Sequence, residues 1–548
     1  MSFYDSASLA FLPSGGAGKD TKAYSIKPTD GSGDFTFSRG SNLTATRVDS
    51  NGLIEKGREN LLLQSNQFDT TWLQTSCSVT SGESGYDGSL DAWLLSKSGS
   101  NGRVRQYMTS TGVRTASIYA KEGTTSWLRI TYGGKTTYFD LGNGVLGNVN
   151  AIDSTITSVG NGFYRCTLTA NAASADYVNI YPADSDGVTS GTSGNIYIQD
   201  AQLEQGLVAT EYIESGATTG KAGILEDSPR FDYSGGASCP SLLLEPSRTN
   251  VWKYSEYLDY SFASVSGVTI SQNTTETLSP EGLYNATKLE GVSFWSLRDF
   301  IAGTNTGTWT ISCYVKAVNA SSNNTFRLSV GGNNYSSNLT ATSEWQRFDL
   351  TITNGGATAA GILRDSSAND ADLYIYGFQV EEGSYPTSYI PNHSGGSVTR
   401  DADSFQNSTN DKPLGAIGQG TWFVELQKLG DDTNQALYLA PTTSNTQQIR
   451  LHFDATNARF RDARNGYSTI GGGVNVKTSM TKMALSIDTT SGIAKVYANG
   501  SQLGSDYTLQ ANTFEFSRIV AEGKGFILKQ SLFFPNASSD AELAALTT

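Results

Sequence analysis

Apolar and polar residues alternate along many short segments of this chain. Residues 115–121, 126–132 and 176–181 place apolar side chains at every second position, which is the pattern of a strand with one buried face. Glycine-containing dipeptides separate such segments, for example at 133–134 and 143–144, and they are typical of tight turns. The pattern therefore predicts an all-β chain of antiparallel strands.

Four blocks of sequence occur twice, in the same order and with small differences in spacing. Loop insertions produce such differences between two copies of one domain. We predict two duplicated antiparallel β-sandwiches of roughly eight strands each, of the jelly-roll type. The paired blocks are 58–68 with 248–258, 115–121 with 310–316, 163–169 with 345–351, and 197–213 with 374–390.

Each copy opens with Arg-x-Asn and closes with Gln-x-Glu-x-Gly followed by Thr-x-Tyr-Ile. These motifs resemble the carbohydrate-binding-module-like jelly rolls repeated in bacteriophage tail and other virion proteins. The stretches 35–54 and 231–250 resemble the head segment and the domain lead-in of the same proteins. The resemblance covers about residues 1–400 and implies a structural role for the motif residues. These are Arg58, Asn60, Gln202, Glu204 and Tyr212 in the first copy and Arg248, Asn250, Gln379, Glu381 and Tyr389 in the second.

The last third of the chain has a different pattern. Alternating segments at 483–488 and 494–498 lead into the turn at 499–500, which is a hairpin signal. This part resembles the laminin-G or concanavalin-A-like sandwich, with 526–534 as its final strand. Ser539 and Glu542 have capping-box spacing and predict a short terminal helix.

These features divide the chain into five parts. We predict an N-terminal head segment at 1–57, jelly rolls at 58–216 and 246–396, a linker at 217–245, and a laminin-G/concanavalin-A-like domain at 397–548. The length of 548 residues suits several domains. The fold class is therefore all-β, with tandem antiparallel β-sandwiches after a short head segment.

Charge and composition narrow the function. The chain has 38 Lys and Arg against 52 Asp and Glu, a formal charge of −14, which argues against a broad nucleic-acid surface. No apolar run is long enough for a membrane span, and the N-terminal residues lack the pattern of a secretory signal. The four cysteines are scattered and are expected to be small buried hydrophobes.

We expect no catalytic machinery. The chain has 2 His, and neither His393 nor His452 lies in a nucleophile motif. Glu204 and Glu381 recur between the copies, and a carboxylate that satisfies backbone donors explains them. A structural calcium ion is the alternative, because Ca²⁺ prefers oxygen ligands, although no Asp-x-Asp-x-Asp loop supports it. No other cofactor is expected.

Sugar binding is the stronger functional hypothesis, because aromatic rings stack on the apolar face of a pyranose. Trp127 and Tyr132 are five residues apart on one strand, so they point to opposite faces and only one can line a groove. In the second copy, Phe326 is the nearest counterpart of Trp127. The candidate platforms are Trp93, Tyr107, Trp127, Tyr132, Trp295 and Tyr335.

The resemblance implies a non-enzymatic virion protein, such as a tail fibre, head fibre or decoration component, that contacts host-surface or environmental glycans. We expect a place on the virion surface, after synthesis in a host cytoplasm and release by lysis. The expected partners are other virion proteins, through residues 1–57, and further copies of this chain. A glycan-degrading hydrolase and a structural scaffold without glycan binding are the alternatives.

Overall fold

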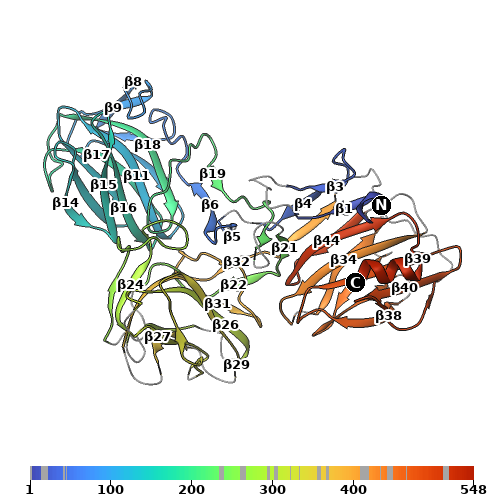
Figure 1. Ribbon diagram of the computed structural model, residues 1–548. Helices are drawn as coiled ribbons and strands as arrows, with labels where there is room; N and C mark the ends of the chain where they lie inside the picture. The colour runs from blue at the N-terminus through green and yellow to red at the C-terminus, as the bar shows by residue number, and fades with distance from the viewer. Residues whose placement is uncertain are drawn as a thin grey trace.

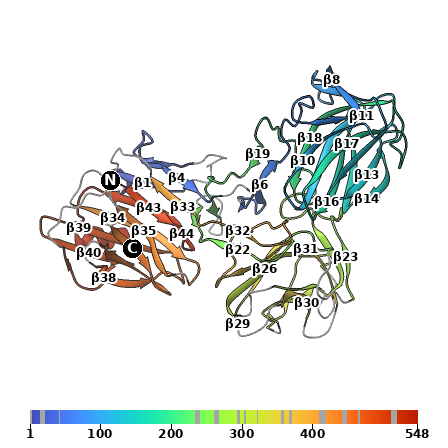
Figure 2. The same ribbon diagram turned by 180° about the vertical axis from the view of Figure 1, so that it is seen from behind.

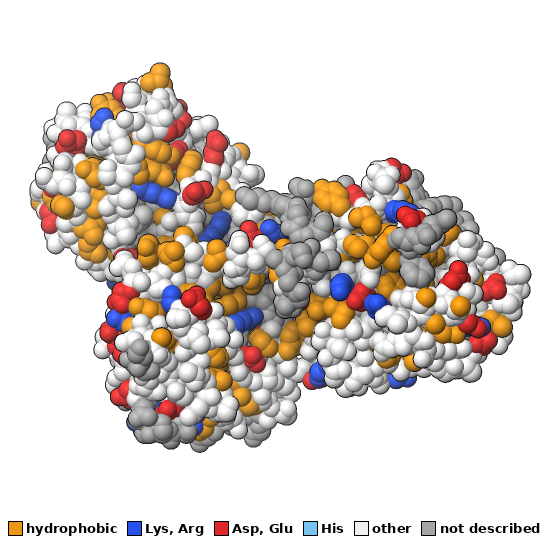
Figure 3. All heavy atoms as spheres, in the orientation of Figure 1, with side chains coloured by type: hydrophobic (Ala, Val, Ile, Leu, Met, Phe, Trp, Pro, Cys, Tyr) orange, Lys and Arg blue, Asp and Glu red, His pale blue; other side chains and the backbone are white. Residues whose placement is uncertain are grey.

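The structure is a computed structural model with three β-sandwiches that form separate lobes (Figures 1 and 3). Almost every regular element is an antiparallel strand, which confirms the predicted all-β fold class. The two helices found in the described part, α1 (Phe3–Ser6) and α2 (Asp540–Thr547), are short. The described residues are 3–13, 22–40, 43–44, 46–233, 240–259, 267–292, 297–301, 306–320, 323–332, 334–354, 359–365, 370–407, 419–431, 433–440, 448–463, 466–509 and 518–548.

The first sandwich packs two six-stranded sheets around a core drawn from residues between Leu62 and Leu203. One sheet has the order β14 (Val145–Asn150), β13 (Lys135–Asp140), β12 (Trp127–Tyr132), β17 (Asp176–Ala183), β10 (Arg103–Met108) and β7 (Leu73–Thr75). The other has the order β15 (Asp153–Gly160), β16 (Phe163–Ala172), β11 (Gly112–Glu122), β18 (Asn195–Gln205), β9 (Ala92–Lys97) and β8 (Cys77–Glu83).

The second sandwich repeats this plan around its own core, between Trp252 and Val380. Its larger sheet has the order β23 (Thr269–Ser271), β24 (Thr287–Val292), β31 (Ala371–Glu382), β26 (Gly307–Ala317) and β29 (Gln346–Asn354). The smaller has the order β25 (Leu297–Phe300), β30 (Ala359–Arg364), β27 (Thr325–Val330) and β28 (Leu339–Thr340).

The C-terminal sandwich also packs two sheets, and α2 covers part of one of them. Ser539 and Glu542 form the capping box that their spacing predicts. One sheet contains β20 (Phe231–Asp232), β21 (Ser241–Leu244), β44 (Phe526–Phe534), β34 (Gly420–Lys428), β39 (Thr481–Asp488), β40 (Ile493–Ala498), β41 (Ser501–Gln502) and β42 (Tyr507–Thr508), with β1 (Leu9–Phe11) and β3 (Ser25–Lys27) beside it. The other contains β2 (Lys22–Ala23), β4 (Phe35–Ser38), β33 (Ser404–Asn407), β43 (Arg518–Glu522), β35 (Asn434–Ala440), β36 (Ile449–Phe453), β37 (Asn457–Asp462) and β38 (Ser468–Asn475).

The N-terminal strands differ from the separate head segment that the sequence analysis expects at 1–57. Strand β1 pairs with β44, and β4 pairs with β33, so both belong to the C-terminal sandwich. The ring of Phe35 stacks on Phe405 with centroids 4.3 Å apart, and Phe11 packs against both rings. The apolar side chains of this segment thus find their core in the last part of the chain, and both chain ends lie on that lobe (Figures 1 and 2).

The expected linker at 217–245 is also built into the fold. It contributes β19 (Gly220–Gly223), which pairs with β6 (Ile54–Asn60), and β6 in turn pairs with β5 (Thr46–Val48). It also contributes β20 and β21 to the C-terminal sandwich. The short pair β22 (Arg248–Asn250) and β32 (Val398–Arg400) completes the connection between the second and third lobes.

A buried cluster of charges joins the first two sandwiches. The Lys56 Nζ lies 2.8 Å from a carboxylate oxygen of Glu281 and also pairs with Glu256. Arg58 pairs with Glu281, and the His393 Nε2 lies 3.7 Å from a Glu256 oxygen. Burial alone would raise the pKa of Glu256, but Lys56 and His393 hold it down, to about 2. This sandwich junction is therefore ionic at its centre.

A second ionic cluster joins the C-terminal sandwich to the linker. Arg230 pairs with both Glu245 and Asp403, and the Arg400 Nη1 lies 3.1 Å from a Glu245 oxygen. The Arg39 Nε lies 3.7 Å from Asp403. Burial is the main reason why the pKa of Arg39 is lowered to about 9. These side chains are fully or almost fully buried, so the lobes are held by specific contacts.

We expect acid to weaken the junction between the first two sandwiches through His393. Burial, opposed in part by Glu256, lowers the pKa of His393 to about 4, whereas an unfolded histidine titrates near 6.5. Between these values the unfolded chain binds more protons, so stability falls as the pH falls. The expected loss between pH 7 and pH 4 from this group is about 3 kcal/mol.

Urea titrations of the protein and of His393→Gln at several pH values would measure the free energy of unfolding. Between pH 7 and pH 4, the free energy of unfolding should fall by about 3 kcal/mol less in the variant than in the unaltered protein. An unchanged pH dependence in His393→Gln would contradict the assignment.

Cys166 and Cys313 are buried as free thiols, and Cys77 is half-buried, which agrees with their predicted role as small hydrophobes. Cys239 lies outside the described residues. Among the described helices, none has the length and hydropathy needed to cross a bilayer.

Candidate functional site

The repeated asparagine ties the first sequence block to the last in both sandwiches. The Asn60 Nδ2 donates to the carbonyls of Ala201 and Ile213, at 3.1 and 2.8 Å, and its Oδ1 accepts from the N–H groups of Leu62 and Leu203. Both Asn60 and its repeat are fully buried. Asn250 makes the corresponding contacts with Phe378, Ile390, Trp252 and Val380.

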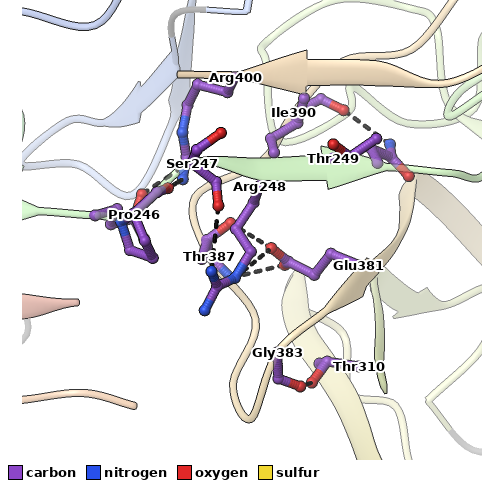
Figure 4. Close-up of polar contacts among 12 residues, drawn as sticks. Pro246, Ser247, Arg248, Thr249, Thr310, Glu381, Gly383, Thr387, Ile390 and Arg400 are labelled. Atoms are coloured by element: carbon purple, nitrogen blue, oxygen red, sulfur yellow. Dashed lines mark hydrogen bonds and ion pairs between the residues drawn. The ribbon is translucent and has the colours of Figure 1, made fainter. Parts of the chain in front are cut away.

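The repeated glutamates are engaged in the same way. Glu204 accepts from the Thr210 N–H and hydroxyl, at 2.8 and 2.7 Å, and Glu381 accepts from Thr387 at 2.8 and 2.6 Å. Burial raises the pKa of Glu381. Figure 4 shows Glu381 facing Thr387, with the Arg248 Nε 4.0 Å from a carboxylate oxygen. The described residues contain no metal-holding group of three His, Cys, Asp or Glu.

The other motif residues also serve internal contacts. Gln202 and Gln379 each donate to the glutamate two residues on, at 2.6 and 2.5 Å. The Tyr212 hydroxyl lies 2.6 Å from the Ser65 Oγ, and the Tyr389 hydroxyl donates to Glu256 at 2.8 Å. The recurring polar residues therefore hold the sandwiches together, and a ligand site has to lie elsewhere.

Two of the predicted sugar platforms are buried. Tyr132 is 0 % exposed and Trp93 is 8 % exposed, and both belong to the core of the first sandwich. They were predicted as aromatic residues on strands, but the pleat turns them inward, so neither can stack on a sugar. Trp295 lies outside the described residues. Tyr335 is half-buried in the second sandwich, beside Arg327.

The remaining two, Trp127 and Tyr107, lie on the outer face of one sheet of the first sandwich. Strand β17 lies between β12 and β10. Its Tyr177 is directly opposite Tyr107, and its Tyr181 is directly opposite Arg129. The side chains that alternate with these are buried, for example Ile130. The pleat therefore brings aromatic and basic side chains from three strands onto one face.

Arginines on this face stack on its tyrosines. The guanidinium carbon of Arg105 lies 4.3 Å from the centre of the Tyr177 ring, and that of Arg129 lies 4.8 Å from Tyr181. Arg103 lies 5.4 Å from Tyr181. Such stacking is favourable, since the ring face is electronegative and the guanidinium is weakly hydrated. We call Arg103, Arg105, Tyr107, Trp127, Arg129, Tyr138, Tyr177, Asn179 and Tyr181 the arginine–tyrosine face.

The second sandwich keeps two of the three arginines of this face and loses the tyrosines of β17. Arg129 pairs with Tyr181 across β12 and β17, and Arg327 pairs with Leu363 across β27 and β30. With Arg327 in the place of Arg129, the registers give the counterparts of the other residues of this face. Arg298 takes the place of Arg105, and the rest are replaced by residues without a ring: Asn179 by Gly361, Tyr177 by Ala359 and Trp127 by Thr325. Phe326, the counterpart expected for Trp127, is buried and takes the place of Leu128.

The sequence analysis missed the arginines and the tyrosines of β17. Residues 103–107 and 177–181 carry the signal, because Arg, Arg and Tyr, and then Tyr, Asn and Tyr, occupy alternate positions. The alternation shows which side chains share a face of each strand. It does not show that β10 and β12 both lie against β17, which is what assembles the site.

The fold and this face define a protein of tandem β-sandwiches in which one sheet of the first sandwich presents a basic and aromatic surface. No protein-family model matches the chain, and no curated protein is significantly similar to it in sequence.

Several solved structures resemble the chain distantly. The CBM40 of the Ruminococcus gnavus IT-sialidase bound to α2,3-sialyllactose is 17 % identical, with a TM-score of 0.21, over 24 % of this chain and 84 % of that one. The CBM22-1–CBM22-2 tandem domain of Paenibacillus barcinonensis Xyn10C is 13 % identical, with a TM-score of 0.20, over 63 % and 96 %. A Trypanosoma rangeli sialidase is 9 % identical, with a TM-score of 0.21, over 93 % and 98 %. Likeness at this level carries no information on ligand or activity.

Proposed function

We propose that this chain is a carbohydrate-binding protein that holds a glycan on the arginine–tyrosine face without cleaving it. The observation that carries the proposal is the placement of Tyr107, Tyr177 and Trp127, none of them buried, on adjacent rigid strands among polar side chains. Aromatic rings supply contact area at a small cost in side-chain entropy. Polar groups beside them can bond to sugar hydroxyls.

The position of the rings on the sheet supports this proposal. Tyr107 is 52 % exposed, and its ring centre lies 4.9 Å from that of Tyr177. The Asn179 Nδ2 is held by the Thr131 hydroxyl at 2.9 Å, which fixes the amide between the rings of neighbouring strands. A face built on paired strands is better preorganised than one built on loops.

The non-enzymatic part of the proposal rests on the two carboxylates that recur between the sandwiches. The recurring pair Glu204 and Glu381 is buried and accepts hydrogen bonds from threonines. General acid–base work on a glycosidic bond needs two carboxyl groups that flank an accessible substrate, and these two lie in different sandwiches. An assay for released reducing ends would test this part, since their release would favour the hydrolase alternative.

Removing Tyr107 and Trp127 together is expected to weaken glycan binding by about tenfold or more, because aromatic anchors dominate binding energies. The measurement is retention of the full chain on a glycan array, followed by titration with any retained glycan. The matched control is Tyr284→Ala, since Tyr284 is equally exposed, at 52 %, on the second sandwich. Equal loss in both variants, or no retained glycan, would contradict the proposal.

We also propose a place for the chain in a bacteriophage virion, as a tail fibre, head fibre or decoration component. This rests on the resemblance of the Arg-x-Asn and Gln-x-Glu-x-Gly motifs and of residues 231–250 to virion jelly rolls, and that of residues 397–548 to laminin-G domains. Since β1 and β4 lie in the C-terminal sandwich, attachment to other virion proteins would use that whole lobe. Mass spectrometry of purified particles tests the proposal, and absence of the chain would overturn it.

A further inference from the structure

The arginines of the arginine–tyrosine face have no acidic partner among the residues that the structure describes. The Nε atoms of Arg105 and Arg129 are buried without a hydrogen-bond partner. The Arg105 guanidinium stacks on Tyr177, and that of Arg129 stacks on Tyr138 and Tyr181. Arg103 donates to the Asn101 carbonyl at 3.1 Å and forms no ion pair. Three cations therefore share one face with no carboxylate to neutralise them.

Three such arginines gather on this one face. Acidic residues exceed basic ones by 52 to 38, and Lys97 in the same sandwich pairs with Asp184 at 2.5 Å. Lys288 in the second sandwich pairs with Glu276 at 2.9 Å. A cluster of arginines without a carboxylate neighbour can bind an anion from outside the protein.

We propose that the arginine–tyrosine face binds acidic glycans, those with carboxylate or sulfate groups on their sugar residues. The inference rests on the proposed function and names its ligand class. Tyr107, Tyr177 and Trp127 would contact the sugar rings, and Arg105 and Arg129 would bind the acidic groups. A guanidinium held by an aromatic ring loses little freedom when it binds a carboxylate in bidentate fashion.

The spacing of the arginines indicates an oligosaccharide. Arg103 and Arg129 flank Tyr181 on opposite sides, and Arg105 lies two residues further along β10. With strands ~4.8 Å apart and a rise of ~3.3 Å per residue, the three Cα atoms are roughly 7–12 Å from each other. A glycan with acidic groups on more than one residue matches these separations better than a single acidic sugar.

The second sandwich provides an internal comparison. Arg298 and Arg327 occupy the places of Arg105 and Arg129, but Ala359 and Leu363 replace Tyr177 and Tyr181. The Arg327 guanidinium stacks on Tyr335 instead, with 4.9 Å between its carbon and the ring centre. The Arg327 Nε donates to the carbonyl of Arg364 at 3.1 Å. Its guanidinium is thus used within the fold, and we assign acidic-glycan binding to the first sandwich.

The test compares each acidic glycan with a neutral form of the same sugar. The full chain is applied to immobilised oligogalacturonates and their methyl esters, and to hyaluronan and alginate oligosaccharides and their carboxyl-reduced forms. Single-stranded DNA is included as a different polyanion. We expect retention of acidic forms only, weakening as NaCl rises. In Arg105→Gln/Arg129→Gln, affinity should fall about tenfold or more, while Arg298→Gln/Arg327→Gln should bind like the unaltered protein.

The outcomes separate this inference from the proposed function. Equal retention of acidic and neutral forms would overturn the preference for acidic glycans and leave sugar binding at this face intact. Retention of no glycan, or of DNA alone, would overturn both. Full binding by Arg105→Gln/Arg129→Gln, with a circular dichroism spectrum that shows it folded, would also overturn the inference.

Discussion

Replacing Asn250 by alanine is expected to destabilise the second sandwich by at least about 3 kcal/mol. The Asn250 Oδ1 accepts from the N–H groups of Trp252 and Val380, at 3.1 and 3.0 Å, and its Nδ2 donates to the Ile390 carbonyl at 2.9 Å. Alanine leaves three backbone groups in a dry interior without these partners. Each unmet buried group costs about 1–3 kcal/mol.

Hydrogen exchange followed by mass spectrometry measures this effect lobe by lobe, which a single melting curve of a three-lobed chain cannot do. In Asn250→Ala, amides of β26 and β31 should lose protection, while those of β11 and β18 keep it. Asn60→Ala is the matched control and should show the reverse pattern. Asn250→Asp places a carboxylate oxygen against the Phe378 and Ile390 carbonyls, to which the Nδ2 donates, and should lose at least as much protection as alanine. If Asn250→Ala or Asn60→Ala reduced protection in both sandwiches, the asparagine would not stabilise its own sandwich alone, and the prediction would be wrong.

Replacing Glu256 by glutamine is expected to open the junction between the first two sandwiches. The change removes one of the two carboxylates that pair with Lys56 and leaves Glu281 to pair with both Lys56 and Arg58. An uncompensated buried charge typically costs 3–5 kcal/mol, so we expect a loss of about that size. The hydroxyls of Tyr376 and Tyr389 also lose a carboxylate acceptor.

Small-angle scattering would detect an increase in the radius of gyration, and exchange of β6 amides would report the junction directly. The control is Lys56→Met/Glu256→Met, which removes one charge of each sign and leaves Arg58 paired with Glu281. Replacement of a buried pair by apolar side chains is often close to neutral. The double variant should therefore be compact. A compact Glu256→Gln variant with unchanged exchange would show that the cluster does not hold the lobes together.

The sequence was sufficient for the parts of the fold that depend on local pattern. Period-two alternation predicted the strands. The two Asn-containing blocks predicted a duplication, because Asn60 and Asn250 make the same hydrogen bonds to the backbone in each copy. The terminal helix followed from Ser539 and Glu542. The strand and helix signals each lie within a few residues of the element that they predict.

Long-range pairings were not accessible in the same way. Nothing in the sequence of β1 or β4 indicates that its partners lie in β44 and β33, since a short apolar strand fits many edges. For the candidate site, alternation placed Trp127 and Tyr132 on opposite faces but did not identify which face is the core. The arginine–tyrosine face also required the order of β10, β17 and β12, which depends on contacts far apart in the chain.

The insertion of the N-terminal strands into the last sandwich sets an order for folding during synthesis. The Ser8 N–H donates to the Phe533 carbonyl, 525 residues further along the chain. A ribosome that adds ~5–20 residues per second reaches that partner ~25–105 s later. The first sandwich can close during this interval. Leu9 and Phe11, which end in the core of the last lobe, can pair with β3 early but have to wait for β44. This apolar segment of the nascent chain therefore lacks the core that buries it until β44 has been made.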